Sequence, residues 1–351
     1  MSRKWRVGVL GLGHWYSAYG LGRDLATYPA AELTAAAWTD PGQLDEFCST
    51  FEIKGYDSYE ALLEREDVDI VQISAPVSDI PRCAIAAAKA GKHIVLGKPM
   101  AMTLAEADEI VRAVEDAGVV CVPFQSLMRF QYAAMKDRIA TGEIGDILLL
   151  HTTCRWSIAE DWYRSGRPGW FVDPAYVPGG ALIDEGIYWI DLVEWLADSH
   201  VRTVEARTAN LVHRDLDVED WGMATFELDN GVIATMEASW TINSPAATAP
   251  SPKQNSVVRL EVVGSRGEIM DQWFRDPGRA VLGAGAANWT FERDAQAPFG
   301  PPTPPLIAHV IDCVENGRDP IATVHDARQA FAAAMAAYDA ARSGSPAPVS
   351  R

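Results

Sequence analysis

The sequence has little positive charge for its length. Its 351 residues include 30 Lys and Arg against 48 Asp and Glu, which gives a formal net charge of −18. A field of this sign repels phosphate backbones and anionic lipid, so we expect neither a nucleic-acid partner nor a role at a membrane surface. A small-molecule ligand is compatible with this charge.

Cysteine pairs, metal-ligand clusters and long apolar runs are also missing. The five cysteines are scattered and include no C-x-x-C pair, which predicts reduced, mostly buried thiols. None of the seven histidines pairs with another ligand at metal spacing, so no metal site is expected. No stretch approaches a membrane span, and the start M-S-R-K-W-R-V-G-V-L lacks the apolar core of a signal peptide. These absences favour a cytoplasmic protein.

The length and the residue pattern predict two domains, residues 1–123 and 124–351. In the first, strands and helices alternate, and a T-x-x-E capping box at Thr103 begins a helix that Gly118 ends. The expected strands are continuous apolar runs at 6–11, 33–38, 69–74, 93–96 and 119–123. Such runs are typical of a parallel sheet covered on both faces, so we predict a doubly wound α/β domain of the Rossmann type.

The second domain has a different pattern. Strands are expected at 146–156, 257–264 and 267–273, and a hairpin over 221–240 around Asn230-Gly231, a pair suited to a type I′ turn. Mostly antiparallel strands with helices on one face predict an α+β domain.

A glycine-containing turn, G-L-G-H-W-Y at residues 11–16, follows the first strand and opens a helix. Gly11 permits a tight turn, and Gly13 lets the backbone approach a pyrophosphate. His14 and Trp15 fall at the helix start, where backbone N–H groups point at the anion. A lone G-x-G is a weak signal, and Tyr16 replaces the usual third glycine or alanine. The alternative is a tight turn with no nucleotide.

Asp40 strengthens the nucleotide interpretation. It is expected to end the second strand, where its carboxylate can accept hydrogen bonds from the ribose hydroxyls of NAD. The same charge would repel the 2′-phosphate of NADP, and no Arg or Lys follows before Lys54. The sequence therefore predicts NAD as the cofactor.

The segment G-G-A-L-I-D-E-G-I-Y-W-I-D-L-V-E-W-L, residues 179–196, is expected to form an amphipathic helix. Asp184, Tyr188 and Asp191 fall at i, i+4 and i+7, so they share a face. A phenol one turn from a carboxylate is a usable acid–base pair. From this segment alone, a packed tyrosine with solvated aspartates is the favoured interpretation.

An aromatic and basic segment precedes this helix and includes Arg155, Trp162 and Trp170. Tryptophan rings suit the C–H surface of a carbohydrate, and arginine suits a carboxylate or sulfonate. A subunit interface or a cover for the sheet would explain this composition equally well.

Several motifs together resemble the Gfo/Idh/MocA family (glucose–fructose oxidoreductase, inositol dehydrogenase and rhizopine catabolism). They are A-G-K-H-I-V-L-G-K-P-M (90–100), G-E-I-G-D-I (142–147), the 179–191 block and N-G-R-D-P (316–320). The resemblance covers nearly the whole chain. It implies a Rossmann domain plus an open-faced α/β domain, a sugar, cyclitol or other polyol as substrate, and a homodimer or homotetramer.

The resemblance also implies roles for individual residues. Lys98 matches the lysine of the E-K-P motif, which contacts the nicotinamide ribose and the reacting hydroxyl. Asp184 matches a substrate-binding aspartate, and Tyr188 stands where many members have the catalytic histidine. The expected cofactor contacts further along the chain are Ser74, Ala75, Pro76, Lys98 and Pro99, and the expected substrate contacts are Arg155, Trp162, Trp170, Asp184, Tyr188 and Asp191.

Three departures from the family pattern stand out. Gly97 replaces the glutamate of E-K-P, A-P-V-S-D-I (75–80) replaces T-P-N-x-x-H, and Trp15 and Tyr16 add bulk beside the glycine turn. These changes leave the fold and the cofactor prediction intact, but they weaken any assignment to a particular substrate.

The resulting hypothesis is an NAD-dependent dehydrogenase or reductase of a CH–OH group. Tyr188 would accept the hydroxyl proton, with its pKa lowered by the nearby Lys98 cation, and Asp184 would hold the substrate. One alternative is a redox-neutral enzyme that retains NAD and cleaves a glycoside, which could be anionic, by oxidation, elimination, addition and reduction. Another is a non-catalytic NAD-binding sensor.

Overall fold

The chain forms two compact units in a computed structural model that describes residues 4–65, 67–156, 169–242, 257–273, 278–293 and 306–351. The first unit comprises Met1–Ser126, Pro168–Pro178 and Pro304–Arg328. The second comprises Leu127–Arg167, Gly179–Thr303 and Gln329–Arg351. Each unit is therefore assembled from segments far apart in the sequence. The division into two continuous domains, 1–123 and 124–351, stays a prediction.

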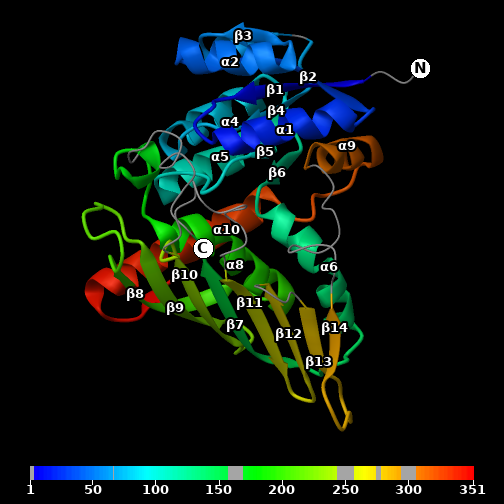
Figure 1. Ribbon diagram of the computed structural model, residues 1–351, viewed down its shortest axis with the longest axis vertical. Helices are drawn as coiled ribbons and strands as arrows, with labels where there is room; N and C mark the ends of the chain where they lie inside the picture. Colours follow the sequence, from blue (N-terminus) through cyan, green and yellow to red (C-terminus); the bar gives the residue numbers. More distant parts are fainter. Residues whose placement is uncertain (1–3, 66, 157–168, 243–256, 274–277, 294–305) are drawn as a thin grey trace. The chain divides into compact units, whose positions relative to one another are not determined.

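The first unit contains a six-stranded parallel sheet in the order β3-β2-β1-β4-β5-β6, flanked by helices (Figure 1). Its strands are β1 (Trp5–Leu10), β2 (Ala31–Ala37), β3 (Lys54–Tyr56), β4 (Ile70–Ile73), β5 (His93–Leu96) and β6 (Cys121–Pro123). Its helices are α1 (Trp15–Thr27), α2 (Pro41–Phe51), α3 (Tyr59–Leu63), α4 (Ile80–Lys89), α5 (Leu104–Ala117) and α9 (Leu306–Asn316), with the short 3-10 helices η1 (Val77–Asp79) and η2 (Trp170–Val172). The expected doubly wound sheet is confirmed, with one additional edge strand, β3.

Local signals in the sequence set the ends of α5. The Thr103 hydroxyl accepts the N–H of Glu106, and the Glu106 carboxylate accepts the N–H of Thr103, so the expected capping box is present. Gly118 ends the helix in the left-handed conformation, with φ at 62°. Ala107, Ile110 and Val114 are buried along one face, as the periodicity predicts.

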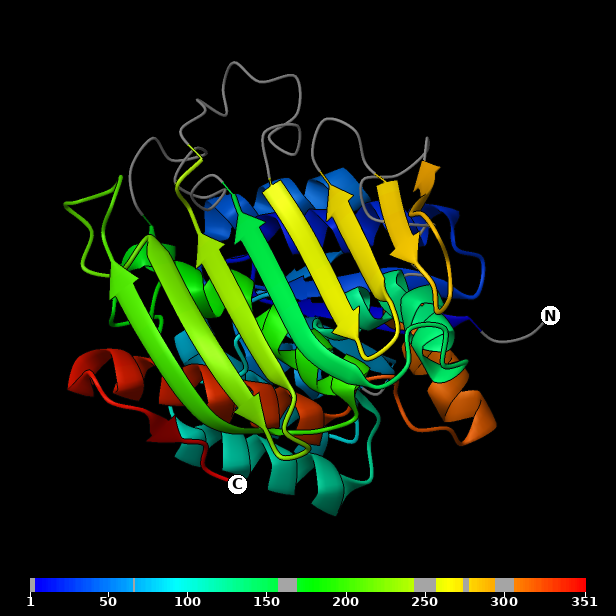
Figure 2. The ribbon, with the colours of Figure 1, turned by 90° about the horizontal axis from the view of Figure 1, so that it is seen from below.

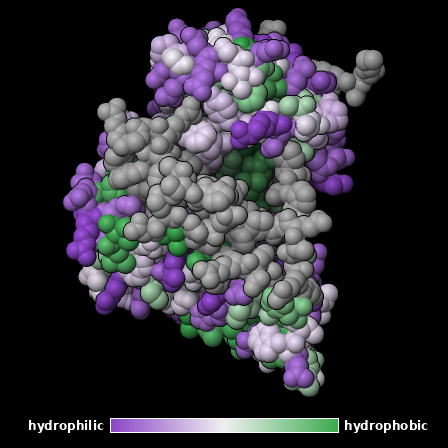
Figure 3. Space-filling view, in the orientation of Figure 1, coloured by the Kyte–Doolittle hydropathy of each residue, from purple (hydrophilic) through white to green (hydrophobic). Residues whose placement is uncertain are grey.

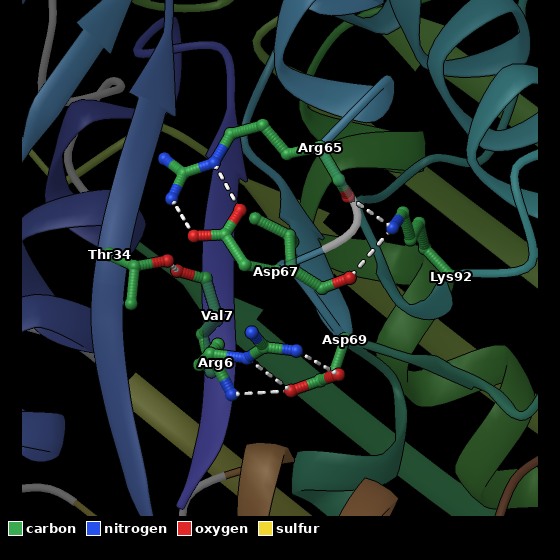
Figure 4. Close-up of polar contacts among 8 residues, drawn as sticks. Arg6, Val7, Thr34, Arg65, Asp67, Asp69 and Lys92 are labelled. Carbon is green, nitrogen blue, oxygen red and sulfur yellow. Dashed lines mark hydrogen bonds and ion pairs between the residues drawn. The ribbon is translucent and has the colours of Figure 1, made fainter.

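Polar side chains tie together the amino ends of β1, β4 and β5 (Figure 4). The guanidinium of Arg6 binds Asp69 through Nε and Nη2 at 3.1 and 3.0 Å. Lys92 is buried and donates from Nζ to the carbonyl oxygens of Arg65 and Val68 at 2.6 and 2.8 Å. At this edge Arg6 is thus held by a carboxylate and Lys92 by two backbone carbonyl oxygens.

The second unit contains a nine-stranded sheet in the order β14-β13-β12-β11-β7-β10-β9-β8-β15. Its strands are β7 (Ile147–Arg155), β8 (Val201–Ala209), β9 (Trp221–Leu228), β10 (Ile233–Ser239), β11 (Val257–Gly264), β12 (Glu268–Trp273), β13 (Gly278–Leu282), β14 (Thr290–Arg293) and β15 (Ala347–Pro348). The accompanying helices are α6 (Ser126–Ala140), α8 (Ala181–Ala197) and α10 (Val324–Ser343). Among the described strand pairs of this sheet only β7 with β10 is parallel, so the expected mostly antiparallel sheet is confirmed.

The expected hairpin around Asn230-Gly231 is present, but its turn type is wrong. Gly231 has a positive φ of 86°, whereas Asn230 does not, so the pair does not form a type I′ turn. Leu228 instead accepts the N–H of Gly231 and donates its own N–H to Val232, which closes a three-residue connection. The Asn230 side chain stabilises the alternative, since its Oδ1 accepts the N–H of Val232 and its Nδ2 donates to Ala197.

Helices cover one face of this sheet. In Figure 2 the strands lie in front, with α8 and α10 behind them. Met223 on β9 and Ile233 on β10 remain 46% and 43% exposed. Figure 3 shows hydrophobic residues at the lower border of this unit among hydrophilic ones. No helix in the described part of the chain combines the length and the hydropathy needed to cross a bilayer.

Candidate functional site

The glycine turn after β1 packs tightly against the turn after β4. Gly11 has a φ of 87°, and a Cβ atom there would lie 2.5 Å from the Ala75 Cα. A Cβ on Gly13 would lie 2.8 Å from the Pro76 Cδ, and His14 donates its N–H to the Ser74 carbonyl at 2.8 Å. Both glycines are therefore required by the close approach of Ser74–Pro76. This contact brings together the expected cofactor residues that follow β1 and β4.

His14 is buried in this turn as a neutral side chain. It is 5% exposed, and its Nδ1 lies 3.2 Å from the Tyr16 hydroxyl. Burial, reinforced by the positive charge of Lys98, lowers its pKa from 6.5 to about 3. Its Nε2 has no hydrogen-bond partner within the described residues. A buried ring nitrogen without a partner is costly unless a ligand satisfies it.

Lys98 follows β5 at the same carboxyl edge of the sheet. It is 6% exposed and precedes Pro99 through a cis peptide bond. Its charge acts on His14, so the lysine and the glycine turn belong to one electrostatic environment. A Cβ on the preceding Gly97 would lie 2.9 Å from the Ile73 carbonyl oxygen. The β4 backbone therefore occupies the space that the family's glutamate would need at this position.

Two further polar side chains are buried at this edge. Gln125 and Ser126 follow β6 and are 1% and 0% exposed. The Gln125 Oε1 and the Ser126 Oγ have no hydrogen-bond partner in the part of the chain that the structure describes. Together with the His14 Nε2, these atoms fit a polar ligand bound along the carboxyl edge, as a dinucleotide is in this fold.

Asp40 and Trp15 have local structural roles as well. β2 ends at Ala37, so Asp40 does not end the strand as expected; it is the exposed N-cap of α2, and its Oδ1 accepts the N–H of Gln43 at 3.0 Å. Trp15 is the first residue of α1, and its ring meets Tyr19 edge-on at 6.4 Å. The second carboxylate oxygen of Asp40 makes no hydrogen bond within the described residues.

In the second unit, α8 carries Asp184 and Tyr188 one turn apart. Asp184 is 7% exposed, and its Oδ2 accepts the indole N–H of Trp240 at 3.2 Å. Tyr188 is half-buried. Ile187 and Ile190 are fully buried, as the apolar spacing predicts. The two expected site residues therefore do share a face, and one carboxylate is already oriented by an indole.

Asp191 has a different environment from the one expected. It is fully buried, and its two oxygens accept hydrogen bonds from the Nε and Nη2 of Arg129 at 2.9 and 2.8 Å. This bidentate pair joins α8 to α6. No motif pointed to Arg129, which lies 62 residues from Asp191 in the chain.

Glu219 and Tyr338 form a second contact that the sequence did not reveal. The Glu219 carboxylate accepts the N–H groups of Gly180 and Leu182 and the Tyr338 hydroxyl at 2.9, 3.0 and 2.7 Å. A Cβ on Gly180 would lie 1.9 Å from the Glu219 carbonyl oxygen, which explains why glycine precedes the helix. Burial raises the pKa of Glu219, against the hydrogen bonds that it accepts. These contacts fix the start of α8.

The aromatic and basic segment is divided between different surroundings. Arg155 forms a bidentate ion pair with Glu237 at 3.0 and 2.6 Å. The Sγ of the preceding residue, Cys154, lies 3.8 Å from Glu185 of α8, on the face of the sheet that the helix covers. Because successive residues of a strand point to opposite faces, Arg155 points to the other face. Trp170 instead packs on the nucleotide turn of the first unit. Trp162 lies outside the described residues.

No metal centre is evident within the described ranges, where no group of three or more His, Cys, Asp and Glu residues could hold an ion. All five cysteines are free.

Comparison with known proteins identifies the family. Residues 5–124 match the model of an oxidoreductase family with an NAD-binding Rossmann fold, and residues 132–270 match the model of the GFO/IDH/MocA C-terminal domain. The chain belongs to the Gfo/Idh/MocA oxidoreductase family. The first unit is accordingly an NAD-binding domain, as the glycine turn predicted.

Curated relatives in this family are named as dehydrogenases and reductases. The chain is 28% identical to scyllo-inositol 2-dehydrogenase (NAD(+)) of Bacillus subtilis, over 99% of this chain and 96% of that enzyme. It is 27% identical to 1,5-anhydro-D-fructose reductase of Ensifer adhaerens over 84% of each chain. These matches confirm the expectation of an NAD-dependent oxidoreductase.

Solved structures of dehydrogenases share the fold. Levoglucosan dehydrogenase in complex with NADH superposes with a TM-score of 0.82 at 22% identity, covering 99% of this chain and 100% of that one. The WlbA dehydrogenase from Bordetella pertussis, in complex with NADH and UDP-GlcNAcA, gives 0.81 at 22% identity, covering 100% and 99%.

Proposed function

We propose that this protein interconverts a secondary alcohol and a ketone on a sugar, cyclitol or related polyol, with NAD as its redox partner. The observation that carries the proposal is the burial of Lys98 just after the carboxyl end of β5, close enough to His14 for its positive charge to lower the pKa of that imidazole. A buried ammonium at this edge is suited to holding a substrate hydroxyl. The names of the relatives support the substrate class.

Residues of the first unit would bind NAD. The N–H groups at the start of α1 suit the pyrophosphate, the His14 Nε2 offers a hydrogen bond, and the unbonded oxygen of Asp40 suits a ribose hydroxyl. Bound NAD supplies the two-electron acceptor or donor. A 2′-phosphate would meet the charge of Asp40, which favours NAD over NADP.

Proton handling is assigned to Lys98 and Tyr188. Lys98 would anchor the substrate hydroxyl and lower the pKa of Tyr188, and Tyr188 would accept the proton during oxidation and return it during reduction. Asp184, which the Trp240 indole N–H orients, would accept a hydrogen bond from a second substrate hydroxyl. Asp191 is occupied by Arg129, so we assign it to positioning α8 rather than to binding substrate.

The test is turnover of the full chain with NAD⁺ and a panel of inositols, anhydrosugars, aldoses and uronates. Stoichiometric NADH formation with one of them is the expected result. Product release without net NADH, but with exchange of the carbon-bound hydrogen, would replace the proposal with the redox-neutral glycoside-cleaving alternative. NAD binding with neither outcome would leave the sensor alternative. The homodimer or homotetramer and the cytoplasmic location stay predictions.

A further inference from the structure

Residues 169–178, which we call the strap, are part of the first unit although they follow β7 in the chain. The strap is internally structured around Asp173, whose carbonyl oxygen accepts the N–H groups of Tyr176 and Val177 at 2.9 and 3.2 Å. The Asp173 side chain also accepts the N–H of Ala175 at 2.9 Å. These contacts make the strap a folded segment with a defined attachment.

Hydrogen bonds join the strap to two turns elsewhere in the first unit. The Trp170 indole N–H donates to the Gly13 carbonyl at 3.4 Å, and Ser78 donates its N–H to the Tyr176 carbonyl at 3.2 Å. Gly13 belongs to the turn after β1, and Ser78 lies in η1, after β4.

These two attachment points flank the switch point of the sheet. β1 and β4 are neighbours, and the strands that follow each of them run outward in opposite directions. Ligands of such sheets bind outside the carboxyl ends of the strands at this reversal. The strap therefore crosses the place where the dinucleotide must lie.

The strap packs against the imidazole ring of His14. Trp170 and Phe171 press edge-on against the His14 ring, with centroids 4.8 and 5.1 Å away. This contact helps to bury His14, whose Nε2 is left without a protein partner among the described residues. A phosphate or ribose oxygen of the dinucleotide would satisfy that nitrogen.

We propose that the strap holds the dinucleotide against the glycine turn, with Trp170 as its anchor, so that NAD(H) exchanges only when this anchor releases Gly13. Trp170 is then a cofactor-positioning residue rather than part of the substrate site. The inference rests on the proposed NAD-dependent function. Beyond that function, we infer that the strap, which lies outside the strands and helices of the α/β sheet, slows the exchange of NAD(H).

The test is the rate of NADH release from the full chain. Protein loaded with NADH is mixed rapidly with excess NAD⁺, and loss of the bound NADH fluorescence is followed. Trp170→Phe keeps a ring against His14 but removes the indole N–H, so release should accelerate about fivefold; Trp170→Ala removes both contacts and should accelerate it at least about 30-fold. Trp5→Ala is the matched control, because Trp5 also donates an indole hydrogen bond, to Glu315, but starts β1 at the opposite edge. It should change the release rate less than about twofold.

If NADH leaves a folded Trp170→Ala protein at the wild-type rate, the proposed role of the strap is wrong, while the proposed NAD dependence still stands. A wild-type protein that binds no NADH would instead overturn the proposed function. If Trp170→Ala fails to fold, Trp170→Phe and amide hydrogen exchange of the wild type decide the matter. The amides of Tyr176 and Val177 should exchange more slowly with NADH bound, and equal exchange with and without NADH would contradict the proposal.

Discussion

Arg129 holds Asp191 through two charge-assisted hydrogen bonds, 2.9 and 2.8 Å long, between side chains that are 6% and 0% exposed. Removing one partner leaves the other charge buried and unpaired. Asp191→Ala should therefore lower the free energy of unfolding by about 3–5 kcal/mol, as measured by urea denaturation. The double variant Arg129→Met/Asp191→Leu should recover most of that loss. A double variant as unstable as the sum of its single changes would contradict this account.

Lys98 and Tyr188 are expected to act on the same substrate hydroxyl. Lys98→Met and Tyr188→Phe should each reduce kcat by about 10²–10⁴-fold, because general acid–base steps contribute that much. Tyr188→Phe should still bind NADH with nearly unchanged affinity, which a fluorescence titration checks. Turnover within a few-fold of wild type for either variant would show that the assignment is wrong.

Gly97 should not tolerate a side chain. The Cβ atom of Gly97→Ala would meet the Ile73 carbonyl oxygen at 2.9 Å and the Ile80 Cδ1 at 3.0 Å. Overpacking of this kind should cost about 1–3 kcal/mol of stability, measured by thermal or chemical unfolding. Gly97→Glu, which restores the family's glutamate, should be at least as unstable and should not raise activity. A stable and more active Gly97→Glu protein would refute this explanation.

Asp40 caps α2 and is also the proposed ribose ligand, and two substitutions separate these roles. Asp40→Ser keeps an N-cap hydroxyl but removes the charge, so it should lower the preference for NAD over NADP by at least about tenfold with little change in stability. Asp40→Ala should show the same change in preference and also lose about 1 kcal/mol. Ratios of kcat/KM for the two cofactors provide the measurement. An unchanged ratio in both variants would remove Asp40 from the cofactor site.

His14 predicts a pH dependence of stability. Its pKa is about 3 in the folded chain and near the ordinary 6.5 in the unfolded chain, so between these values only the unfolded state binds the proton. Stability should therefore fall as the pH is lowered from about 6.5 towards 3, by up to about 1.4 kcal/mol per pH unit. His14→Asn should flatten this slope in denaturation measured across the same range. An equally steep slope in the variant would assign the effect to other groups.

Elements with local signals could be predicted from the sequence. The α5 helix begins at a capping box and ends at a glycine, and both signals lie within the segment that they delimit. The parallel strands are apolar runs that need no partner to be recognised. β3 was missed because three residues are too few to establish a periodicity. Asn230 was misassigned because its side-chain hydrogen bonds, which the turn rule ignores, favour another turn.

Members of the candidate site could be proposed from the sequence where a motif marks them, whereas contacts between distant residues could not. Lys98, Asp184 and Tyr188 follow from short patterns. The partners that orient α8 do not, because Arg129 and Tyr338 come from other elements and lie 62 and 119 residues from the carboxylates that they bind. Trp170 carried the right chemistry for a sugar, but its contact with Gly13 depends on where a connecting segment docks, which no local pattern encodes.

The discontinuous first unit also bears on how the protein is made. α9 packs beside β5 and β6, burying Leu306, Ile307, Val310 and Ile311, and the Trp5 indole donates to Glu315 at its end. The strands of the nucleotide-binding sheet are thus synthesised early, but α9, which covers part of that sheet, is synthesised only after β7–β14 of the other unit. During that interval an apolar surface beside β5 and β6 stays open to chaperones and proteases. Both units should consequently mature together, at the end of translation.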